Sequence, residues 1–386
     1  GILMLAFLGL NIINQRFQMS DLRVYHEALL WWIDGQSPYG RSFGLSSGFY
    51  KYSLTAALFF TPLTWLSWGT AKVLYYLAIA GSIMYFLPKM VEKTRKLFFF
   101  QPRRTVMVIV ISLIFIGGHF SRELLLGNIN WFLLLLVVLV FALMENKLSY
   151  LAGAFFAIAL IFKPHFVLLL PWMVLRGEWK ALISTFVTVG LLLILPAVGI
   201  GWEANQHMLG EWLMSMQAHN VRLEESPNTM YAWLNAWTHY MGMPGWAAVV
   251  MVLMFIGPLF ALFMLKHQIK EKALPLAKGH RYLEYFGLVG LIPNFVHTDT
   301  EHFLWSVPML FILVWYLVQE GRRSRAWWIL VVVMLMPYGW ATPDIWGAKG
   351  AEWLQISGVL GMANVMIVLL GWTGGHRQLR ICNLPR

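Results

Sequence analysis

An aspartate opens a polar stretch, residues 20–40, that lies between two apolar segments. Apolar residues in the stretch recur at helical spacing, which predicts a short amphipathic helix over residues 21–33, with Ser20 as its N-cap and Gly35 at its end. The helix dipole favours the ionised form of Asp21 in the first turn. Such a carboxylate can take a proton from a hydroxyl group, or it can simply cap the helix.

Cations and amides follow at the ends of later apolar runs. Arg122 precedes Gly127-Asn128-Ile129-Asn130, a compact polar entry to the next apolar run. Lys163-Pro164-His165 interrupts another apolar stretch. A proline and a cation at membrane depth are tolerated beside a cavity or protein partners. A basic cluster of this kind can receive a phosphate, although outward cations at helix ends also bind lipid head groups.

Two more polar groups come later in the chain. Asn228 lies within residues 226–231, and His297-Thr-Asp-Thr-Glu-His302 precedes an apolar run. The oxygen and nitrogen atoms of the second group would suit a divalent ion, but their spacing matches no strong ligand signature, so we expect neither metal nor cofactor. The single cysteine, Cys382, excludes an internal disulfide and a cysteine-based zinc site.

Membrane helices are the elements that would position these residues. The chain is 59% hydrophobic and 12% charged, and its apolar runs of about 15 to 22 residues match the length that crosses a bilayer. We therefore expect an all-α, polytopic integral membrane protein with a single membrane domain over residues 1–386. Residues 1–13 look like the second half of a spanning helix, so the chain is expected to begin inside the first span.

About 12 spans are predicted. Besides the first, they cover roughly residues 71–88, 105–119, 131–144, 148–162, 165–175, 181–200, 245–265, 282–296, 303–319, 327–341 and 353–372. Residues 53–67 are short for a span and carry Pro62, so we expect a half-depth or re-entrant helix there. A thirteenth span remains the alternative.

Basic residues predict which side each loop faces. They cluster in residues 89–104, 266–281, 322–325 and the C-terminal tail, which the positive-inside rule assigns to the cytoplasm. The formal net charge of +11 then reflects topology, and no nucleic-acid partner is expected. The extracytoplasmic side receives a first loop over 14–52, which includes Tyr39, a long loop over 201–244 with surface-lying helices, and the other candidate residues.

These residues together resemble glycosyltransferase family 87, a branch of the GT-C glycosyltransferases that use polyprenyl-phosphate sugars. The beginning of the family pattern is matched by Asp21, Tyr25, Ala28 and Gly35-Gln-Ser-Pro38-Tyr39. Its middle is matched by Arg122, Gly127-Asn128-Ile-Asn130 with Asn in place of Gln, Ala152-Gly153 and Lys163-Pro164. Its last elements are matched loosely by Asn228-Thr-Met and Thr300-Glu-His302.

The resemblance implies a GT-C fold and an inverting transferase that moves a hexose, mannose in this family, from polyprenyl phosphate to a lipid or lipid-linked acceptor. The site would face the periplasm from a bacterial plasma membrane, among membrane lipids. Asp21 would be the general base, and His302 would lie near the carrier phosphate. The other expected substrate-binding and phosphate-binding residues are Arg122, Lys163, His165, Asn128, Asn130, Tyr39, Asn228 and His297.

A lipid-linked-sugar flippase or another transporter is the alternative, and an inactive scaffold subunit is a weaker one. Transporters often carry two similar halves and broken helices near the membrane midplane. Here the polar residues gather on one predicted face, and no internal repeat is visible. This pattern favours the transferase.

Overall fold

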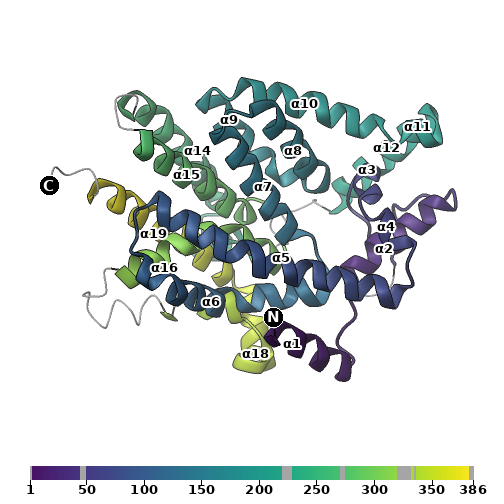
Figure 1. Cartoon of the computed structure of the whole chain (residues 1–386), viewed down its shortest axis with the longest axis horizontal. Helices are drawn as coiled ribbons and strands as arrows, with labels where there is room; N and C mark the ends of the chain where they lie inside the picture. The colour runs from purple at the N-terminus through teal and green to yellow at the C-terminus, as the bar shows by residue number, and fades with distance from the viewer. Residues whose placement is uncertain are drawn as a thin grey trace. The chain divides into compact units, whose positions relative to one another are not determined.

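A computed structural model describes residues 2–43, 49–219, 228–269, 274–296, 298–319, 332–333 and 336–381. Within these ranges the regular elements are helices, and one antiparallel bridge joins Ser42 to Phe49. The chain, drawn in Figure 1, divides into two compact units by its internal contacts. Unit 1 comprises Gly1–Tyr85 and Ser121–Val221, and unit 2 comprises Phe86–Phe120 and Arg222–Arg386. Each unit is described by itself.

In the described ranges, helices follow one another without sheets between them. Up to residue 219 they are α1 (Ile2–Ile13), α2 (Ser20–Ile33), α3 (Leu54–Leu58), α4 (Thr61–Thr64), α5 (Trp68–Leu97), η1 (Pro102–Arg104), α6 (Thr105–Leu126), α7 (Asn130–Glu145), α8 (Ser149–Phe162), η2 (Pro164–Leu169), α9 (Leu170–Arg176), α10 (Trp179–Ile194), α11 (Ala197–Ile200) and α12 (Trp202–His219). The later ones are α13 (Met230–Tyr240), α14 (Trp246–Ile269), α15 (Leu274–Leu291), η4 (Ile292–Asn294), η5 (Thr300–Ser306), α16 (Val307–Gln319), α18 (Pro343–Ile356) and α19 (Val359–Ile381).

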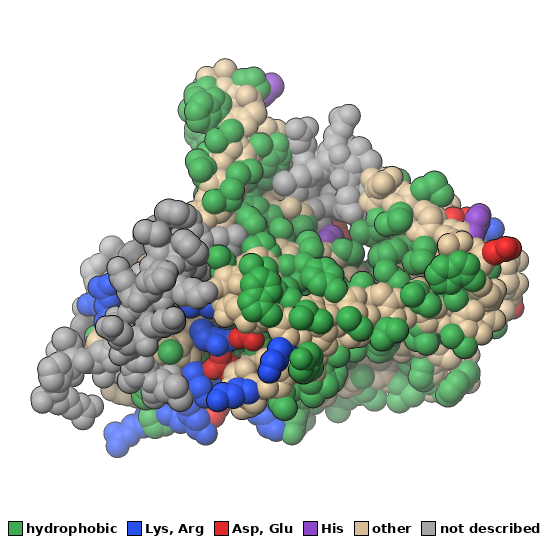
Figure 2. Space-filling view, turned by 90° about the horizontal axis from the view of Figure 1, so that it is seen from above, with side chains coloured by type: hydrophobic (Ala, Val, Ile, Leu, Met, Phe, Trp, Pro, Cys, Tyr) green, Lys and Arg blue, Asp and Glu red, His purple; other side chains and the backbone are tan. Residues whose placement is uncertain are grey.

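In the described part of the chain, five helical stretches are long and apolar enough to cross a membrane. They are Trp68–Leu97, Pro102–Leu126, Trp179–Ile200, Thr300–Gln319 and Val359–Ile381. Large apolar side chains stay exposed on several helices, and hydrophobic side chains cover much of the face seen in Figure 2. The chain is therefore a multi-pass membrane protein, as its composition predicts.

Most predicted spans coincide with helices, but the prediction for residues 353–372 is wrong at its start. The span expected over 353–372 is interrupted, because α18 ends at Ile356 and α19 begins after Gly358, which has a φ of 71°. The helix expected over 71–88 continues as α5 through the basic segment that follows it. Ion pairs from Glu92 to Arg95 and Lys96 stabilise that last part. The span expected over 327–341 falls largely outside the described residues.

The short segment over 53–67 and the long segment over 201–244 also contain helices. Residues 53–67 form α3 and α4, of five and four residues. At about 1.5 Å per residue, neither helix is long enough to cross a bilayer. The long segment over 201–244 contains α12 and α13, and residues 220–227 between them are outside the described residues.

In unit 1, α8 lies directly against α10 (Figure 1). A Cβ atom on Gly153 would lie 2.1 Å from the carbonyl oxygen of Ala181, so the two helix backbones touch at this glycine. The Thr185 hydroxyl donates to the Gly153 carbonyl (3.2 Å), and the Ser184 hydroxyl donates to the Tyr150 carbonyl (2.6 Å). Small residues and hydroxyls of this kind hold membrane helices together at close range.

In unit 2, α16 is the central helix and packs against α15 and α19. Trp305 and Trp315 are fully buried, and the Trp315 ring stacks on Phe100 with ring centroids 5.3 Å apart. Gly371 of α19 has no room for a Cβ atom, because the Met309 carbonyl oxygen would lie 2.6 Å from it. The backbones of α16 and α19 therefore approach each other closely at this glycine.

Candidate active site

The helix that carries Asp21 forms as predicted, but its N-cap is a different residue. Ser20 is already the first residue of α2, and Met19 precedes it in the left-handed conformation, with φ 54°. The Met19 amide donates to the Leu125 carbonyl oxygen of α6 (3.0 Å). The prediction of a Ser20 cap is therefore wrong, because a tertiary contact with α6 begins the helix. Gly35, with φ 75°, follows its end as expected.

A glycine turn brings the end of α6 against α2. Gly127 has a φ of 67°, which disfavours any side chain. A Cβ atom there would lie 2.7 Å from Met19 Sδ and 2.8 Å from Leu22 Cβ. Glycine therefore satisfies both the turn and the close approach, and the next residue, Asn128, lies beside Asp21.

Asn128 holds the Asp21 carboxylate. Its Nδ2 donates to Asp21 Oδ2 over 2.6 Å. The orientation of the amide is consistent with its other contacts, since Oδ1 accepts from the Ile129 backbone amide (2.7 Å) and from the Tyr25 hydroxyl (3.4 Å). Asp21 itself is neither buried nor fully exposed. The structure therefore presents an oriented carboxylate at a partly open position.

Asn130 belongs to a second, buried group of polar side chains. Glu123 of α6 accepts from the Trp131 backbone amide (2.7 Å) and from Asn130 Nδ2 (3.3 Å). Lys163 Nζ donates to Asn130 Oδ1 over 2.6 Å. Glu123 and Asn130 are fully buried, and Lys163 is 7% exposed. The Asn130 amide therefore links a carboxylate to an ammonium group, and Glu123 caps the first turn of α7 from a neighbouring helix.

Glu123 is the residue that sequence reasoning missed. It lies beside Arg122, for which the sequence predicts a role in phosphate binding. A charged residue inside an apolar helix is itself a signal, because it normally has a polar partner within the protein. Side chains on adjacent helical residues point about 100° apart, and here Glu123 is buried while Arg122 is exposed.

The break at Lys163-Pro164 is confirmed. Phe162 ends α8, Lys163 is extended with φ −134° and ψ 99°, and Pro164 begins η2. The break directs Lys163 toward Asn130, as its hydrogen bond shows. His165, the second residue of η2, is half-buried.

Tyr39 lies in a group of tyrosines next to α2. Its hydroxyl donates to the Tyr52 carbonyl oxygen (3.0 Å), and the Tyr52 hydroxyl lies 3.1 Å from that of Tyr25. Burial raises the pKa of Tyr39, and the negative charge of Glu211 raises it further. Burial likewise raises the pKa of Tyr25. Both phenols therefore stay protonated and can donate hydrogen bonds at neutral pH.

In unit 2, His302 is buried on η5 and is held by the residues before it. The Asp299 backbone amide donates to His302 Nδ1 (2.9 Å), and Thr298 Oγ1 lies 2.7 Å from the same nitrogen. A backbone amide can only donate, so Nδ1 is an acceptor and the proton of the neutral ring is on Nε2. An Nε2–H group can donate to an anionic oxygen.

The other candidates of unit 2 are less completely described. Asn228 is half-buried, and its Oδ1 is buried with no hydrogen-bond partner among the described residues. Nearby, Asn294 accepts from the Met230 amide (3.0 Å) and donates to Asn364 (2.7 Å), which fixes the start of α13. His297 lies outside the described residues. Within the described part, no group of three or more His, Cys, Asp or Glu side chains could hold a metal ion.

Residues 50–289 match glycosyltransferase family 87, and the chain belongs to this family, which is of the GT-C type. The matched range contains the Glu123–Asn130–Lys163 group, while Asp21 precedes it and His302 follows it. The chain is also similar to the α-(1→3)-arabinofuranosyltransferase of Corynebacterium glutamicum, with 24% identity over 235 residues, 61% of this chain and 53% of that protein. It thus spans about half the length of this curated relative. No solved structure matches the chain.

Proposed function

We propose that the protein is an inverting glycosyltransferase that moves a hexose, mannose, from a polyprenyl-phosphate carrier to a lipid or lipid-linked acceptor. The reaction takes place at the extracytoplasmic face of a bacterial plasma membrane, without a metal ion or other cofactor. The observation that carries the proposal is the Asp21 carboxylate held at 2.6 Å by Asn128, in a chain of glycosyltransferase family 87.

In the proposed reaction, Asp21 is the general base. An acceptor hydroxyl donates a hydrogen bond to the carboxylate while its oxygen attacks the anomeric carbon of the donor sugar. The bond from that carbon to the phosphate oxygen breaks, its electron pair leaves with the polyprenyl phosphate, and the hydroxyl proton passes to Asp21. A single displacement inverts the anomeric configuration. The Asn128 amide supports this role because it fixes one carboxylate oxygen and so limits the rotation of Asp21.

The leaving phosphate is already a stable anion, so the protein mainly has to hold it with cations and hydrogen-bond donors. We propose His302 Nε2–H as one donor and Arg122 and His165 as further contacts. Lys163 supplies positive charge, but its hydrogen bond to Asn130 makes it partly a structural residue. Tyr39, Asn128, Asn130, Asn228 and His297 complete the proposed substrate-binding residues.

A second candidate function differs in the sugar. The similar protein of Corynebacterium glutamicum is named an arabinofuranosyltransferase. A pentofuranose on the same type of carrier would need the same base and the same phosphate contacts. The donor assay below therefore includes both sugars.

The test uses the purified full chain in lipid vesicles, with radiolabelled polyprenyl-phosphate mannose or polyprenyl-phosphate arabinofuranose and a membrane lipid extract as acceptor. We expect transfer from the mannose donor, and Asp21→Asn should lower its rate by about 10²- to 10⁴-fold because the general base is lost. Asp34→Asn, at the other end of α2, is the matched control and should retain activity.

Activity of Asp21→Asn equal to wild type would remove Asp21 as the base. Transfer from the arabinofuranose donor alone would replace mannose with the second candidate. Movement of intact donor across the vesicle membrane without sugar transfer would instead support a flippase and overturn the proposed reaction.

A further inference from the structure

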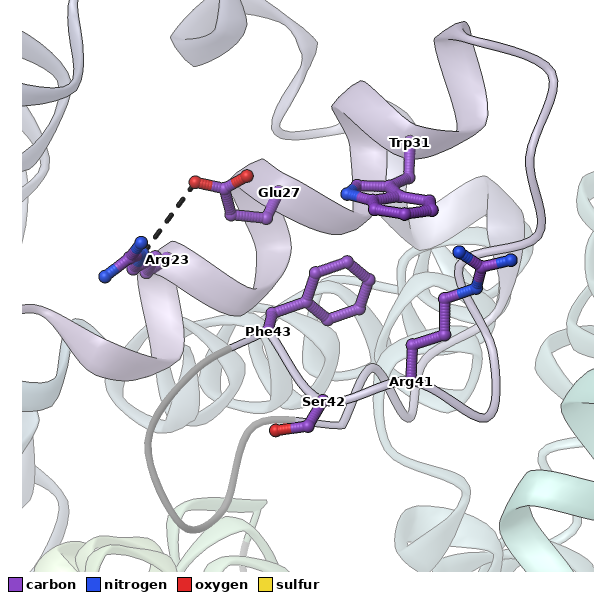
Figure 3. Close-up of a pocket in the computed structure, with 6 residues that line it drawn as sticks. All are labelled: Arg23, Glu27, Trp31, Arg41, Ser42 and Phe43. Carbon is purple, nitrogen blue, oxygen red and sulfur yellow. Dashed lines mark ion pairs between the residues drawn. The ribbon is translucent and has the colours of Figure 1, made fainter.

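A cavity of about 290 Å³ lies between α2 and the loop that follows it (Figure 3). Arg23, Glu27 and Trp31 recur every fourth residue and form one stripe of the helix. This stripe starts about 200° around the helix from Asp21. The loop after α2 supplies the opposite wall, so the complete lining is Arg23, Glu27, Trp31, Arg41, Ser42 and Phe43.

Two aromatic rings and one arginine lie together in the lining of the cavity. The Arg41 guanidinium group stacks over the Trp31 ring, 4.3 Å from its centroid. The Phe43 ring meets Trp31 nearly at a right angle, with centroids 6.4 Å apart. Arg41 also donates to Gln36 over 3.3 Å. In Figure 3, Arg23 and Arg41 lie on opposite sides of the Phe43 ring. A ligand above that ring is therefore flanked by two guanidinium groups.

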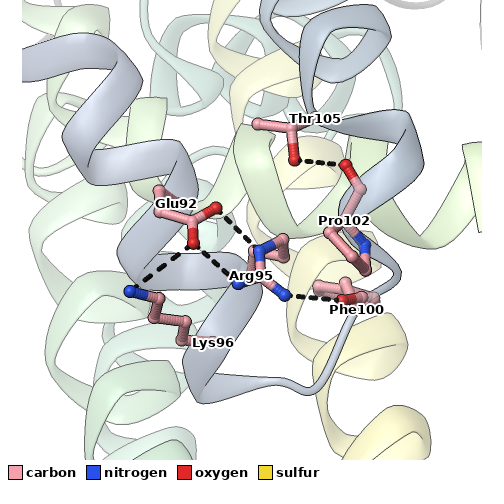
Figure 4. Close-up of polar contacts among 6 residues, drawn as sticks. All are labelled: Glu92, Arg95, Lys96, Phe100, Pro102 and Thr105. Carbon is pink, nitrogen blue, oxygen red and sulfur yellow. Dashed lines mark hydrogen bonds and ion pairs between the residues drawn. The ribbon is translucent and has the colours of Figure 1, made fainter.

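The cavity has an excess of positive charge, with two arginines and one glutamate. Arg23 Nε lies 3.8 Å from a Glu27 carboxylate oxygen, beyond hydrogen-bond distance, and the Arg23 side chain is 49% exposed. Arg95 in α5 is bound differently, because Glu92 accepts from both its Nε (2.7 Å) and its Nη2 (2.6 Å), as Figure 4 shows. A guanidinium group has five N–H donors, so Arg23 and Arg41 retain donors that can bind an oxyanion.

An exposed apolar side chain adjoins the cavity wall. Phe49, which is bridged to Ser42, is 49% exposed. A small soluble anion would gain no binding energy from this side chain. Tryptophan and exposed apolar residues next to cations are typical of the membrane–water interface, where a lipid offers both a charged head group and acyl chains.

We propose that this cavity binds the phosphodiester head group of an anionic phospholipid. Arg41, held over Trp31, binds the phosphate, and Arg23 adds positive charge on the other side of Phe43. Glu27 accepts hydrogen bonds from hydroxyls of the head group, Ser42 donates or accepts them, and Phe49 contacts the acyl chains. The bound lipid holds the outer face of α2 at the membrane surface, while the opposite face carries Asp21. The inference does not depend on the proposed transferase reaction, because it concerns lipid binding alone.

The test is native mass spectrometry of the full chain in detergent, titrated with phosphatidylglycerol, phosphatidylcholine or glycerol 3-phosphate. We expect phosphatidylglycerol to bind about tenfold more tightly than phosphatidylcholine, and Arg23→Gln/Arg41→Gln to remove about tenfold or more of that affinity. Arg103→Gln/Arg104→Gln removes the same formal charge at η1 and should bind like wild type. Binding by glycerol 3-phosphate should be much weaker, because it has no acyl chains.

Glu27→Gln gives a result that misfolding cannot produce. It removes the one negative charge of the cavity and the partner of Arg23, so phosphatidylglycerol should bind about two- to fivefold more tightly. Unchanged binding by the double arginine variant, or equal affinity for the two phospholipids, would overturn the proposal. Glycerol 3-phosphate binding as tight as that of phosphatidylglycerol would mean a site for a soluble phosphate instead.

Discussion

Asn128 donates a hydrogen bond of 2.6 Å to the carboxylate of Asp21, although the two residues are 107 positions apart in the chain. The contact exists because the turn after α6 passes directly over the first turn of α2. The geometry of the candidate base therefore depends on a turn in another segment. Variants in that turn should affect Asp21 without touching it.

Gly127→Ala should disturb this turn. It places a side chain at a positive φ, which costs about 1 to 2 kcal/mol, and it pushes a methyl group into Met19 and Leu22. Gly35→Ala is the matched control, since Gly35 also has a positive φ but nothing lies within 4 Å of its Cβ position. We expect Gly127→Ala to have the lower melting temperature and to lose transferase activity. Equal effects of the two variants would mean that the close approach is unimportant.

Glu123 and Lys163 should depend on each other for stability. Breaking a buried charge arrangement by removing one partner typically costs about 3 to 5 kcal/mol. Glu123→Gln and Lys163→Met should therefore each lower the melting temperature strongly, because each leaves a buried charge beside Asn130. The double variant should lose less than the sum of the two, since no charge is left unbalanced. Strictly additive losses would show that the two charges do not interact.

His302 can be tested with two side chains that replace different ring nitrogens. His302→Asn keeps an acceptor near the Nδ1 position, where the Asp299 amide donates, but it has nothing at the Nε2 position. His302→Gln can reach the Nε2 position with a donor. If Nε2–H binds the donor phosphate, His302→Asn should raise the KM for the polyprenyl-phosphate sugar about tenfold or more, and His302→Gln should raise it less. A KM that stays unchanged in both variants, with unchanged melting temperature, would rule out the phosphate contact.

His26 should make the stability of the protein sensitive to acid. Burial lowers the pKa of His26, and the neighbouring Glu27 carboxylate opposes this only in part. In the unfolded chain the imidazole has its ordinary pKa of about 6.5, so below that pH the unfolded state binds more protons than the folded state. Stability should therefore fall as the pH drops below about 6.5.

Melting curves at pH 7.5 and pH 5.5 check this prediction. His26→Phe keeps an aromatic ring next to Trp68, whose ring centroid lies 5.4 Å from that of His26. The variant should show a smaller loss of melting temperature between the two pH values than wild type. The same loss in both proteins would assign the acid sensitivity to other groups.

Features that depend on neighbouring residues could be predicted from the sequence. The helix over 21–33, its end before Gly35 and the break at Lys163-Pro164 all follow from local spacing, glycine and proline. Ser357-Gly358 is also a turn signal of this kind, although the apolar residues on either side of it predict one span over 353–372.

Features that depend on distant contacts could not be predicted. The N-cap at Met19 exists because α6 lies beside it, and no local signal replaces Ser20 in that role. The family resemblance selected Asn130 and Lys163 as ligands of a substrate, whereas the structure joins them to each other and, through Asn130, to Glu123. Residue order along the chain does not show which side chains of separate helices meet.

Gly153 also has a role that depends on a distant contact, although it carries no reactive group. Because Gly153 has no side chain, α8 and α10 can approach each other closely, and α8 ends immediately before Lys163. A larger residue at position 153 would push α8 away from α10. This would shift the C-terminal end of α8 and the Lys163 ammonium group that follows it. A variant at Gly153 would therefore act through helix packing, although Ala152-Gly153 is also part of the resemblance to the family pattern.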